Sequence, residues 1–147
     1  MSETKVLPYV LLVFRLVVGL TMMYYGSQKL FGIFGGSGFN PTLTMFQDKM
    51  GIPPVLGALA IFAEFAGGLG VLLGAVTRVA AFGIFCTMAV ATFMGAKSIT
   101  TLEMVNGVDP IRGTAYPLLI CTIAFALVLL GGGSFSVDSK LLRRKKK

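Results

Sequence analysis

The chain has 147 residues, of which 55% are hydrophobic and only 13% are charged, and its mean hydropathy is +0.84. A soluble domain carries roughly 25% charged residues, so the composition excludes an ordinary soluble domain and indicates a membrane protein. By its length the chain is one domain, residues 1–147. The net charge of +7 is concentrated at the C-terminus. Six of the 13 basic residues lie there: Lys140, Arg143, Arg144, Lys145, Lys146 and Lys147.

Four apolar runs are long enough to cross a hydrocarbon core, which requires about 20 residues of helix. They cover roughly residues 7–26, 53–75, 78–96 and 114–132. Because backbone amides in lipid must be bonded within the segment, each run is predicted to be a helix. The predicted fold is therefore an all-α integral membrane four-helix bundle. Only a short connection, Ala75 to Arg78, joins the second run to the third, so these two are predicted to be antiparallel neighbours.

The stretch between the first two runs contains a further predicted helix. Asn40 and Pro41 fit its N-cap and first helical position, and Gly51 followed by Pro53 fits its C-terminal end. Three apolar residues fall on one face: Leu43, Phe46 and Met50. Three polar residues fall largely on the other: Thr44, Gln47 and Asp48. This pattern predicts a short amphipathic helix on the outer membrane surface or over the mouth of the bundle.

Basic residues near the span ends predict the orientation, because Lys and Arg are enriched on the cytoplasmic side. One set of ends holds Lys5, Arg78 and the basic tail, residues 133–147, and is predicted to be cytoplasmic. The other set mixes both signs: Lys29, Lys49, Lys97, Arg112, Asp48, Glu103 and Asp109. Both termini are therefore expected inside. Because the tail follows a span, it is expected to bind anionic membrane lipid and not nucleic acid.

Two charges of opposite sign lie inside apolar runs, Arg15 in the first and Glu64 in the second. Ionisable groups in hydrocarbon are costly, so they face a protein interior, find partners and often mark function. Arg15 lies ~13 Å from the inner edge and Glu64 ~16 Å from the outer edge, nearly one level in a core about 30 Å thick. We therefore predict an Arg15–Glu64 pair near the midplane. Lys29 adds a second positive charge roughly 21 Å above Arg15.

Two interpretations of these charges stay open. They form either a buried ion pair that only fixes helix register or a site that handles a ligand or a proton. The chain has no His and no metal-ligand spacing, so no cofactor is expected through protein metal ligands. An electron carrier would be a dissolved ligand such as a quinone, or would belong to a partner protein. Cys86 and Cys121 are expected to be packing residues, with a dithiol role left open.

Short motifs follow one another along the chain in a fixed order. The first span carries Arg15-x-x-x-Gly19 and Gly26-x-x-Lys29-Leu30. Then come Gly51-x-Pro53, Glu64-x-x-Gly67-Gly68, Leu73-Gly74-x-x-Thr77-Arg78 and Gly131-x-Gly133-x-x-Ser136-x-Asp138. In this order the motifs resemble those of the DoxX family of small four-helix bacterial membrane proteins, over nearly the whole chain. The chain departs from that family in lacking a His that many members carry near the end of the third span.

The resemblance implies structural roles for the remaining motif residues: Gly19, Gly26, Gly67, Gly68, Gly74, Arg78 and Asp138. The family is similar to subunits of thiosulfate:quinone oxidoreductase, and some members belong to membrane complexes in redox defence. It therefore implies a subunit of a quinone-linked oxidoreductase or redox-stress complex in the bacterial plasma membrane, binding a small ligand at Arg15, Glu64 and Lys29. A non-catalytic anchor for a partner protein and a small-solute or proton transporter remain alternatives. Homo-oligomerisation is left open.

Overall fold

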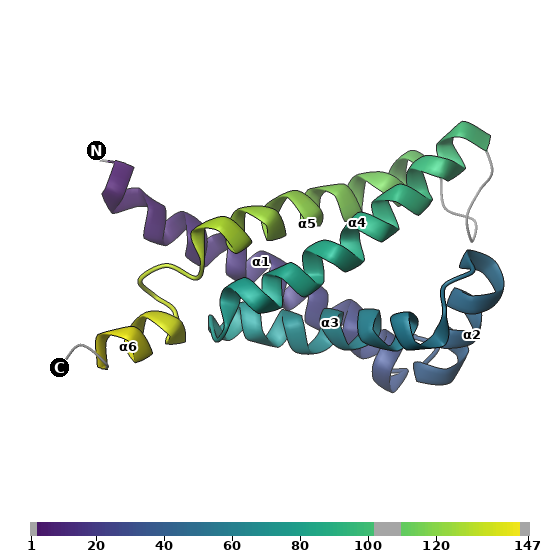
Figure 1. The fold of residues 1–147 in the computed structure, drawn as a ribbon, viewed down its shortest axis with the longest axis horizontal. Coiled ribbons are helices and arrows are strands. Elements are labelled where there is room, and N and C mark those ends of the chain that lie inside the picture. The colour runs from purple at the N-terminus through teal and green to yellow at the C-terminus, as the bar shows by residue number, and fades with distance from the viewer. Residues whose placement is uncertain (1–2, 102–109, 145–147) are drawn as a thin grey trace.

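The computed structural model describes residues 3–101 and 110–144 (Figure 1). In these ranges the chain forms α1 (Glu3–Phe31), α2 (Phe39–Met50), α3 (Pro54–Leu73), α4 (Thr77–Thr101), α5 (Pro110–Leu130) and α6 (Val137–Arg144). Glu103 and Asp109, predicted for the second outer connection, lie outside the described residues, as do the side chain of Arg112 and residues 145–147 of the tail.

Four of these helices are long and apolar enough to cross a membrane, namely α1, α3, α4 and α5. Large apolar side chains cover their outer faces, among them Leu20, Phe93 and Leu119, which are 58%, 68% and 64% exposed. A protein in water does not carry so much contiguous apolar surface, whereas lipid acyl chains cover it favourably. The predicted all-α membrane bundle is confirmed. The first span is longer than residues 7–26, because α1 continues through the polar residues on both sides of that run.

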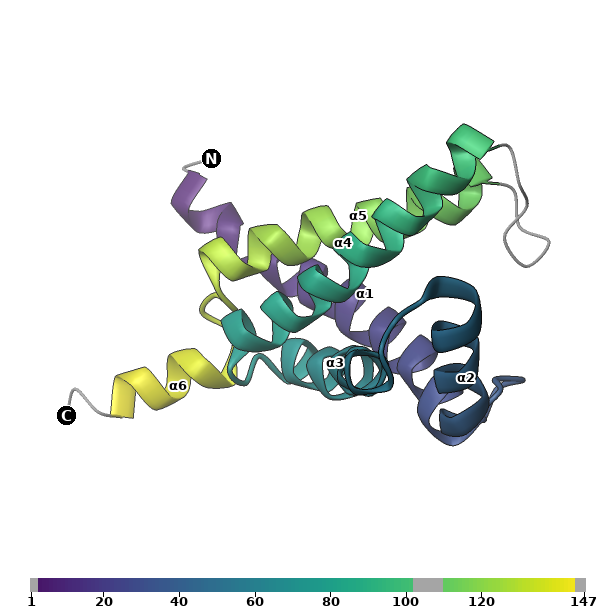
Figure 2. The ribbon, with the colours of Figure 1, turned by 45° about the vertical axis from the view of Figure 1, so that its right-hand side comes forward.

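The bundle is built from two helix pairs. α1 packs chiefly against α3 and α4 chiefly against α5, while contacts between α3 and α4 join the pairs. Both ribbon views show the α4–α5 pair diverging from α2 and α3 toward one end of the molecule, and both chain termini at the opposite end (Figures 1 and 2). The core where the pairs meet is apolar and includes Val18, Met22, Val71, Ile84 and Leu127.

Two glycines of α1 fix how it lies along α3. A Cβ on Gly26 would stand 2.6 Å from the backbone N of Phe65, and a Cβ on Gly19 would stand 2.7 Å from Cβ of Leu72. No side chain fits such a gap, so the two helices touch nearly backbone to backbone. Both contacts belong to one antiparallel register, since they are separated by the same number of residues on each helix.

α2 crosses the end of the bundle distal to the termini and packs against α3 (Figure 2). Its predicted N-cap at Asn40 is wrong, because the N-cap is Gly38. Gly38 has φ of 83°, which glycine adopts without strain, and its carbonyl accepts hydrogen bonds from both N and Oγ1 of Thr42. The predicted C-terminal end is confirmed. Gly51, with φ of 64°, closes α2, and Phe46 on the apolar face is buried.

Candidate functional site

The buried carboxylate of Glu64 forms an ion pair with Lys29. Lys29 Nζ lies 2.6 Å from each carboxylate oxygen, Oε1 and Oε2. Glu64 is only 2% exposed, whereas the Lys29 side chain is 29% exposed. Lys29 Nζ also lies 5.8 Å from the centre of the Phe46 ring on α2, a cation–π contact. The pair therefore links α1, α2 and α3 in the half of the bundle distal to the termini.

The predicted Arg15–Glu64 pair is wrong. Arg15 is 2% exposed, and its guanidinium donates hydrogen bonds to backbone carbonyls at the C-terminal end of α3 and after α5. Nε donates to Val71 O at 2.9 Å, Nη2 to Leu72 O at 2.9 Å, and Nη1 to Gly132 O at 3.1 Å. A helix leaves its last carbonyls without intrahelical partners and carries partial negative charge there. Arg15 therefore satisfies the C-terminal end of α3 and ties it to the turn after α5.

The glycine contacts explain why Arg15 and Glu64 do not lie at the same level of the bundle. The register that pairs Gly26 with Phe65 places Glu64 beside the Ser27–Lys29 turn of α1. The same register places Arg15 level with the connection after α3, about 18 Å along the helix from Glu64. The ends of apolar runs are poor markers of relative depth, because α1 is 29 residues long and extends beyond its apolar run at both ends.

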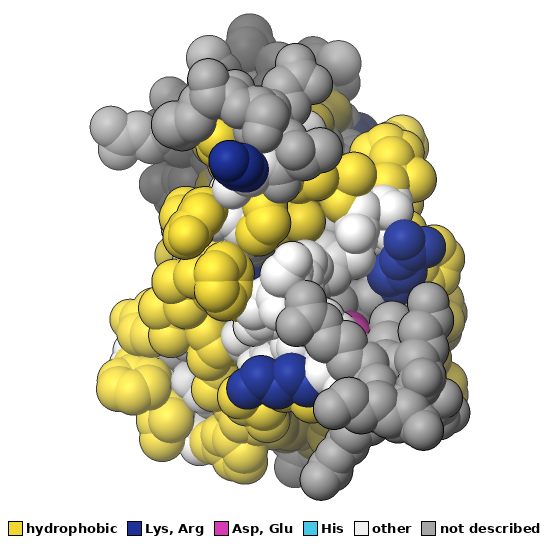
Figure 3. All heavy atoms as spheres, turned by 90° about the vertical axis from the view of Figure 1, so that its left-hand side faces the viewer, with side chains coloured by type: hydrophobic (Ala, Val, Ile, Leu, Met, Phe, Trp, Pro, Cys, Tyr) yellow, Lys and Arg dark blue, Asp and Glu magenta, His cyan; other side chains and the backbone are white. Residues whose placement is uncertain are grey.

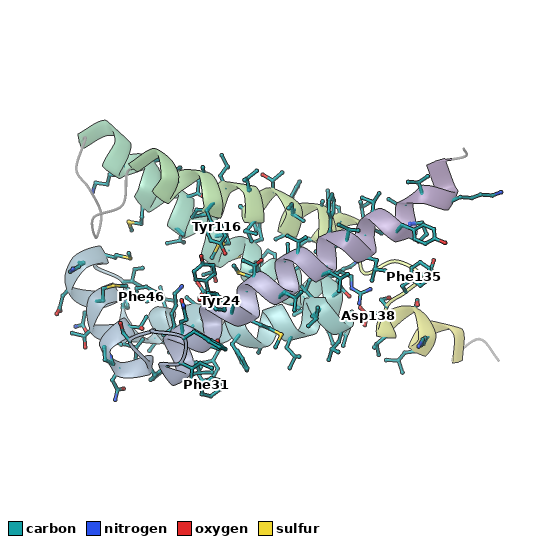
Figure 4. The ribbon with its side chains drawn as sticks, turned by 180° about the vertical axis from the view of Figure 1, so that it is seen from behind. Tyr24, Phe31, Phe46, Tyr116, Phe135 and Asp138 are labelled. Atoms are coloured by element: carbon teal, nitrogen blue, oxygen red, sulfur yellow. The ribbon has the colours of Figure 1, made fainter. Side chains whose placement is uncertain are left out.

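A buried tyrosine that the sequence did not single out lies at the same end of the bundle as Phe46, the ring that Lys29 contacts (Figure 4). The Tyr116 hydroxyl of α5 is buried and has no hydrogen-bond partner among the described residues. Its ring is 5.3 Å from that of Tyr25 on α1, and Tyr25 precedes Lys29 by four residues, about one helical turn, on the same helix. Figure 4 shows Tyr116, Tyr24 and Phe46 at one end of the bundle. A tyrosine inside an apolar span was the available signal, since a hydroxyl in lipid needs a partner.

An apolar cleft opens where the two helix pairs diverge. It has a volume of about 790 Å³ and lies between α2 and α3 on one side and α4 on the other. Its lining includes Phe46, Met50, Leu56, Cys86, Val90 and Gly113. Phe46 belongs both to this cleft and to the contact with Lys29. The Lys29–Glu64 pair is therefore connected through Phe46 to one wall of an apolar cleft that adjoins the bilayer.

At the opposite end of the bundle, Asp138 joins two motifs from distant parts of the chain. Its carboxylate accepts hydrogen bonds from Val76 N at 2.7 Å and from Thr77 N and Oγ1 at 2.8 Å each, at the start of α4. Its own amide donates to Gly74 O at 2.9 Å. Although burial alone would raise the pKa of this carboxyl, the hydrogen bonds from Thr77 and Val76 and the charge of Arg15 hold the pKa below its ordinary value.

Gly74 is required for this arrangement. It has φ of 71°, and a Cβ there would stand 2.6 Å from the Arg15 guanidinium carbon and 2.6 Å from Cβ of Ser136. The motif around Gly74 and Thr77 and the closing motif around Ser136 and Asp138 thus form one packed unit with Arg15. Figure 4 shows Asp138 and Phe135 at this end, away from Tyr116 and Phe46.

Among the comparisons with known proteins, one family matches the chain. No curated protein and no solved structure matches the chain. The DoxX family matches over residues 10–97, which include Arg15, Lys29, Glu64 and the Gly74–Arg78 motif. The match covers more than half of the chain and includes α1, α2 and α3 nearly in full. This protein, a multi-pass helical membrane protein, therefore belongs to the DoxX family.

Proposed function

We propose that the protein is a membrane subunit of a quinone-linked oxidoreductase and binds the quinone headgroup at Lys29, Glu64 and Tyr116. The observation that carries the proposal is the buried Tyr116 hydroxyl, which has no hydrogen-bond partner in the described part of the chain and lies at the same end of the bundle as Phe46, the ring that Lys29 contacts (Figure 4). A buried hydroxyl without a partner costs about 1–3 kcal/mol, and a ligand carbonyl would remove that cost.

The chemistry of the donors fits a quinone. A quinone carbonyl accepts hydrogen bonds, and the Tyr116 hydroxyl and the Lys29 ammonium are donors. A bound quinone supplies two-electron redox chemistry and takes up two protons when it is reduced. The Lys29–Glu64 pair can hold a proton close to such a carbonyl, since one member is partly exposed and the other is buried. The electrons would come from a redox partner protein.

The neighbouring apolar cleft fits the rest of such a ligand. Ligand sites are typically apolar clefts of about 300–1,000 Å³ with few polar groups, and this cleft of about 790 Å³ falls in that range. It adjoins the membrane-facing surfaces of α3 and α4, so an isoprenoid chain would enter from the bilayer without crossing water.

The direct test is quinone binding by the purified protein in mild detergent. Native mass spectrometry would measure retention of a short-chain quinone by the wild type, by Glu64→Gln and by Tyr116→Phe. We expect each variant to lose about tenfold in affinity, as the loss of one hydrogen bond to a buried group costs about 1–2 kcal/mol. Tyr9→Phe is the matched control, because Tyr9 is 61% exposed near the opposite end of α1. Equal retention by wild type and both site variants would overturn the proposal.

A further inference from the structure

A second hollow lies at the end of the bundle that carries both termini. It has a volume of about 650 Å³ and is lined by residues from the start of α4, the end of α5 and the first turn of α6. Its walls include Thr77, Arg78, Val79, Leu130, Ser139 and Leu141. It is separate from the Lys29–Glu64 site, because Glu64 lies near the middle of α3 and the hollow lies beyond the C-terminal end of that helix.

Arg78 supplies a positive charge to this hollow. The side chain is exposed, and its Nε lies 3.3 Å from the point where a Cβ of Gly131 would stand, so it lies over the turn after α5. Within the described residues it forms no ion pair. The Asp138 carboxylate already accepts hydrogen bonds from the backbone and hydroxyl of Thr77 and from Val76. An arginine at the end of a span that has no ion-pair partner in the described part of the chain is suited to bind a phosphate.

Besides the polar residues Thr77, Ser136, Asp138 and Ser139, the hollow has apolar walls that face the membrane. Val79, Leu130 and Leu141 are 69%, 50% and 54% exposed. A soluble anion would make no use of these side chains, whereas a lipid with a phosphate and acyl chains would cover both parts. α6 adds to the same pattern, since its short helix places exposed Lys140 next to Leu141. Such basic amphipathic helices lie in the interfacial layer of anionic membranes.

We propose that this hollow is a binding site for an anionic glycerophospholipid, with Arg78 bound to the phosphate and the acyl chains along Val79 and Leu130. Figure 3 views this end and shows basic side chains spread around it among yellow apolar and white polar atoms. The proposal does not depend on quinone binding. It adds a defined headgroup site to the general attraction between the basic tail and an anionic membrane surface.

Native mass spectrometry of the full chain, with added phosphatidylglycerol or phosphatidylcholine of the same acyl chains, tests this site. We expect the wild type to retain phosphatidylglycerol in preference to phosphatidylcholine. The affinity of Arg78→Gln for phosphatidylglycerol should be about fivefold lower, since one basic group near a membrane surface contributes about 1 kcal/mol. Arg78→Lys should keep most of that affinity. The control is Lys5→Gln, which removes one exposed charge near the N-terminus and does not touch the hollow.

Three outcomes would overturn the proposal. The first is equal loss of lipid in Arg78→Gln and Lys5→Gln, which would mean that only overall charge matters. The second is equal retention of phosphatidylcholine and phosphatidylglycerol by the wild type. The third is displacement of the lipid by glycerol 3-phosphate at the same concentration, which would assign the hollow to a soluble phosphate. Circular dichroism of each variant shows whether the helices are intact, and Arg78→Lys supplies the comparison if Arg78→Gln is unfolded.

Discussion

Asp138 stabilises the start of α4 from outside that helix. A helix start leaves amide groups without intrahelical partners, and these are usually satisfied by a side chain just before the helix. Here the acceptor is the carboxylate of Asp138, at the start of α6, which is 61 residues from Thr77 in the sequence. The same residue, through its amide, satisfies the carbonyl of Gly74 that follows α3. One side chain therefore fixes the α3–α4 connection to the C-terminal region.

The stability of the protein should depend on pH through Asp138. Because its pKa is lowered in the folded state, the ionised carboxylate stabilises the fold above the unfolded pKa, which is about 3.9. That contribution is lost as the pH falls through the lower folded value. We expect Asp138→Asn to lower the free energy of unfolding by about 1–3 kcal/mol at neutral pH. The difference from wild type should narrow below about pH 4.

Thermal unfolding in one detergent across a pH series measures this effect. Asp48→Asn is the matched control, since Asp48 lies exposed on α2. A difference between wild type and Asp138→Asn that stayed constant down to low pH would show that the carboxylate charge has no such role.

Val76 should be a site where substitution stabilises the protein. This exposed residue has φ of 49°, and a β-branched residue in the left-handed region is strained by roughly 1–2 kcal/mol. Asn adopts this region more readily and keeps the amide that donates to Asp138. Val76→Asn should therefore raise the midpoint of thermal unfolding. Val79→Asn in the regular part of α4 is the comparison, and a rise there as large as that at Val76 would contradict the explanation by strain.

The sequence identified the charged residues of the site but not how they are paired. Arg15, Glu64 and Lys29 could be singled out because charges in apolar runs are costly. The choice between Arg15 and Lys29 as the partner of Glu64 depended on the longitudinal offset of α1 and α3. That offset is set by backbone contacts at glycines, which hydropathy does not report. Tyr116 was missed because an aromatic residue in an apolar run is ordinary until its hydroxyl is seen to have no partner.

Among the elements, the spans were predictable, α2 was predictable except for its start, and α6 was not. About 20 apolar residues in lipid must be helical, so α3, α4 and α5 follow from composition. α2 was predicted from its amphipathic pattern, yet its start depends on the φ angle of Gly38, which the sequence leaves open. α6 was predicted only as a basic tail. Its helical form depends on tertiary contacts of Asp138 with the α3–α4 connection.

Close packing of α1 on α3 predicts that Gly19 and Gly26 tolerate no side chain. In Gly26→Ala the added Cβ would stand 2.6 Å from the Phe65 backbone, and such overpacking costs typically about 1–3 kcal/mol. Because the helices would have to separate, the Lys29–Glu64 pair should also be disturbed. The midpoint of thermal unfolding of Gly26→Ala should fall well below that of Gly113→Ala, whose added Cβ meets nothing within 4 Å. Comparable midpoints would show that α1 and α3 are farther apart.

Across the whole molecule, the two buried charges serve different ends of the bundle. Arg15, with Asp138 and the closing motif, holds together the end that carries the termini. Glu64, paired with Lys29, is connected through Phe46 to the apolar cleft that opens where the helix pairs diverge. The tightly packed end can keep the pairs in place while the other end remains open to a ligand from the bilayer.

This separation can be tested by two double-mutant cycles on the free energy or midpoint of thermal unfolding. Sites far apart that share no partner are additive to within about 0.5 kcal/mol. Arg15→Gln and Glu64→Gln should therefore be additive, because the two residues lie about 18 Å apart along the bundle. Lys29→Gln and Glu64→Gln should be strongly non-additive, since Lys29 Nζ lies 2.6 Å from the Glu64 carboxylate. The coupling energy of Arg15 with Glu64 could instead equal that of Lys29 with Glu64. Such a result would support an Arg15–Glu64 pair and contradict the register of α1 and α3. Additivity in the first cycle together with coupling in the second would assign Lys29 as the partner of Glu64, and would leave Arg15 as the residue that closes the end of α3.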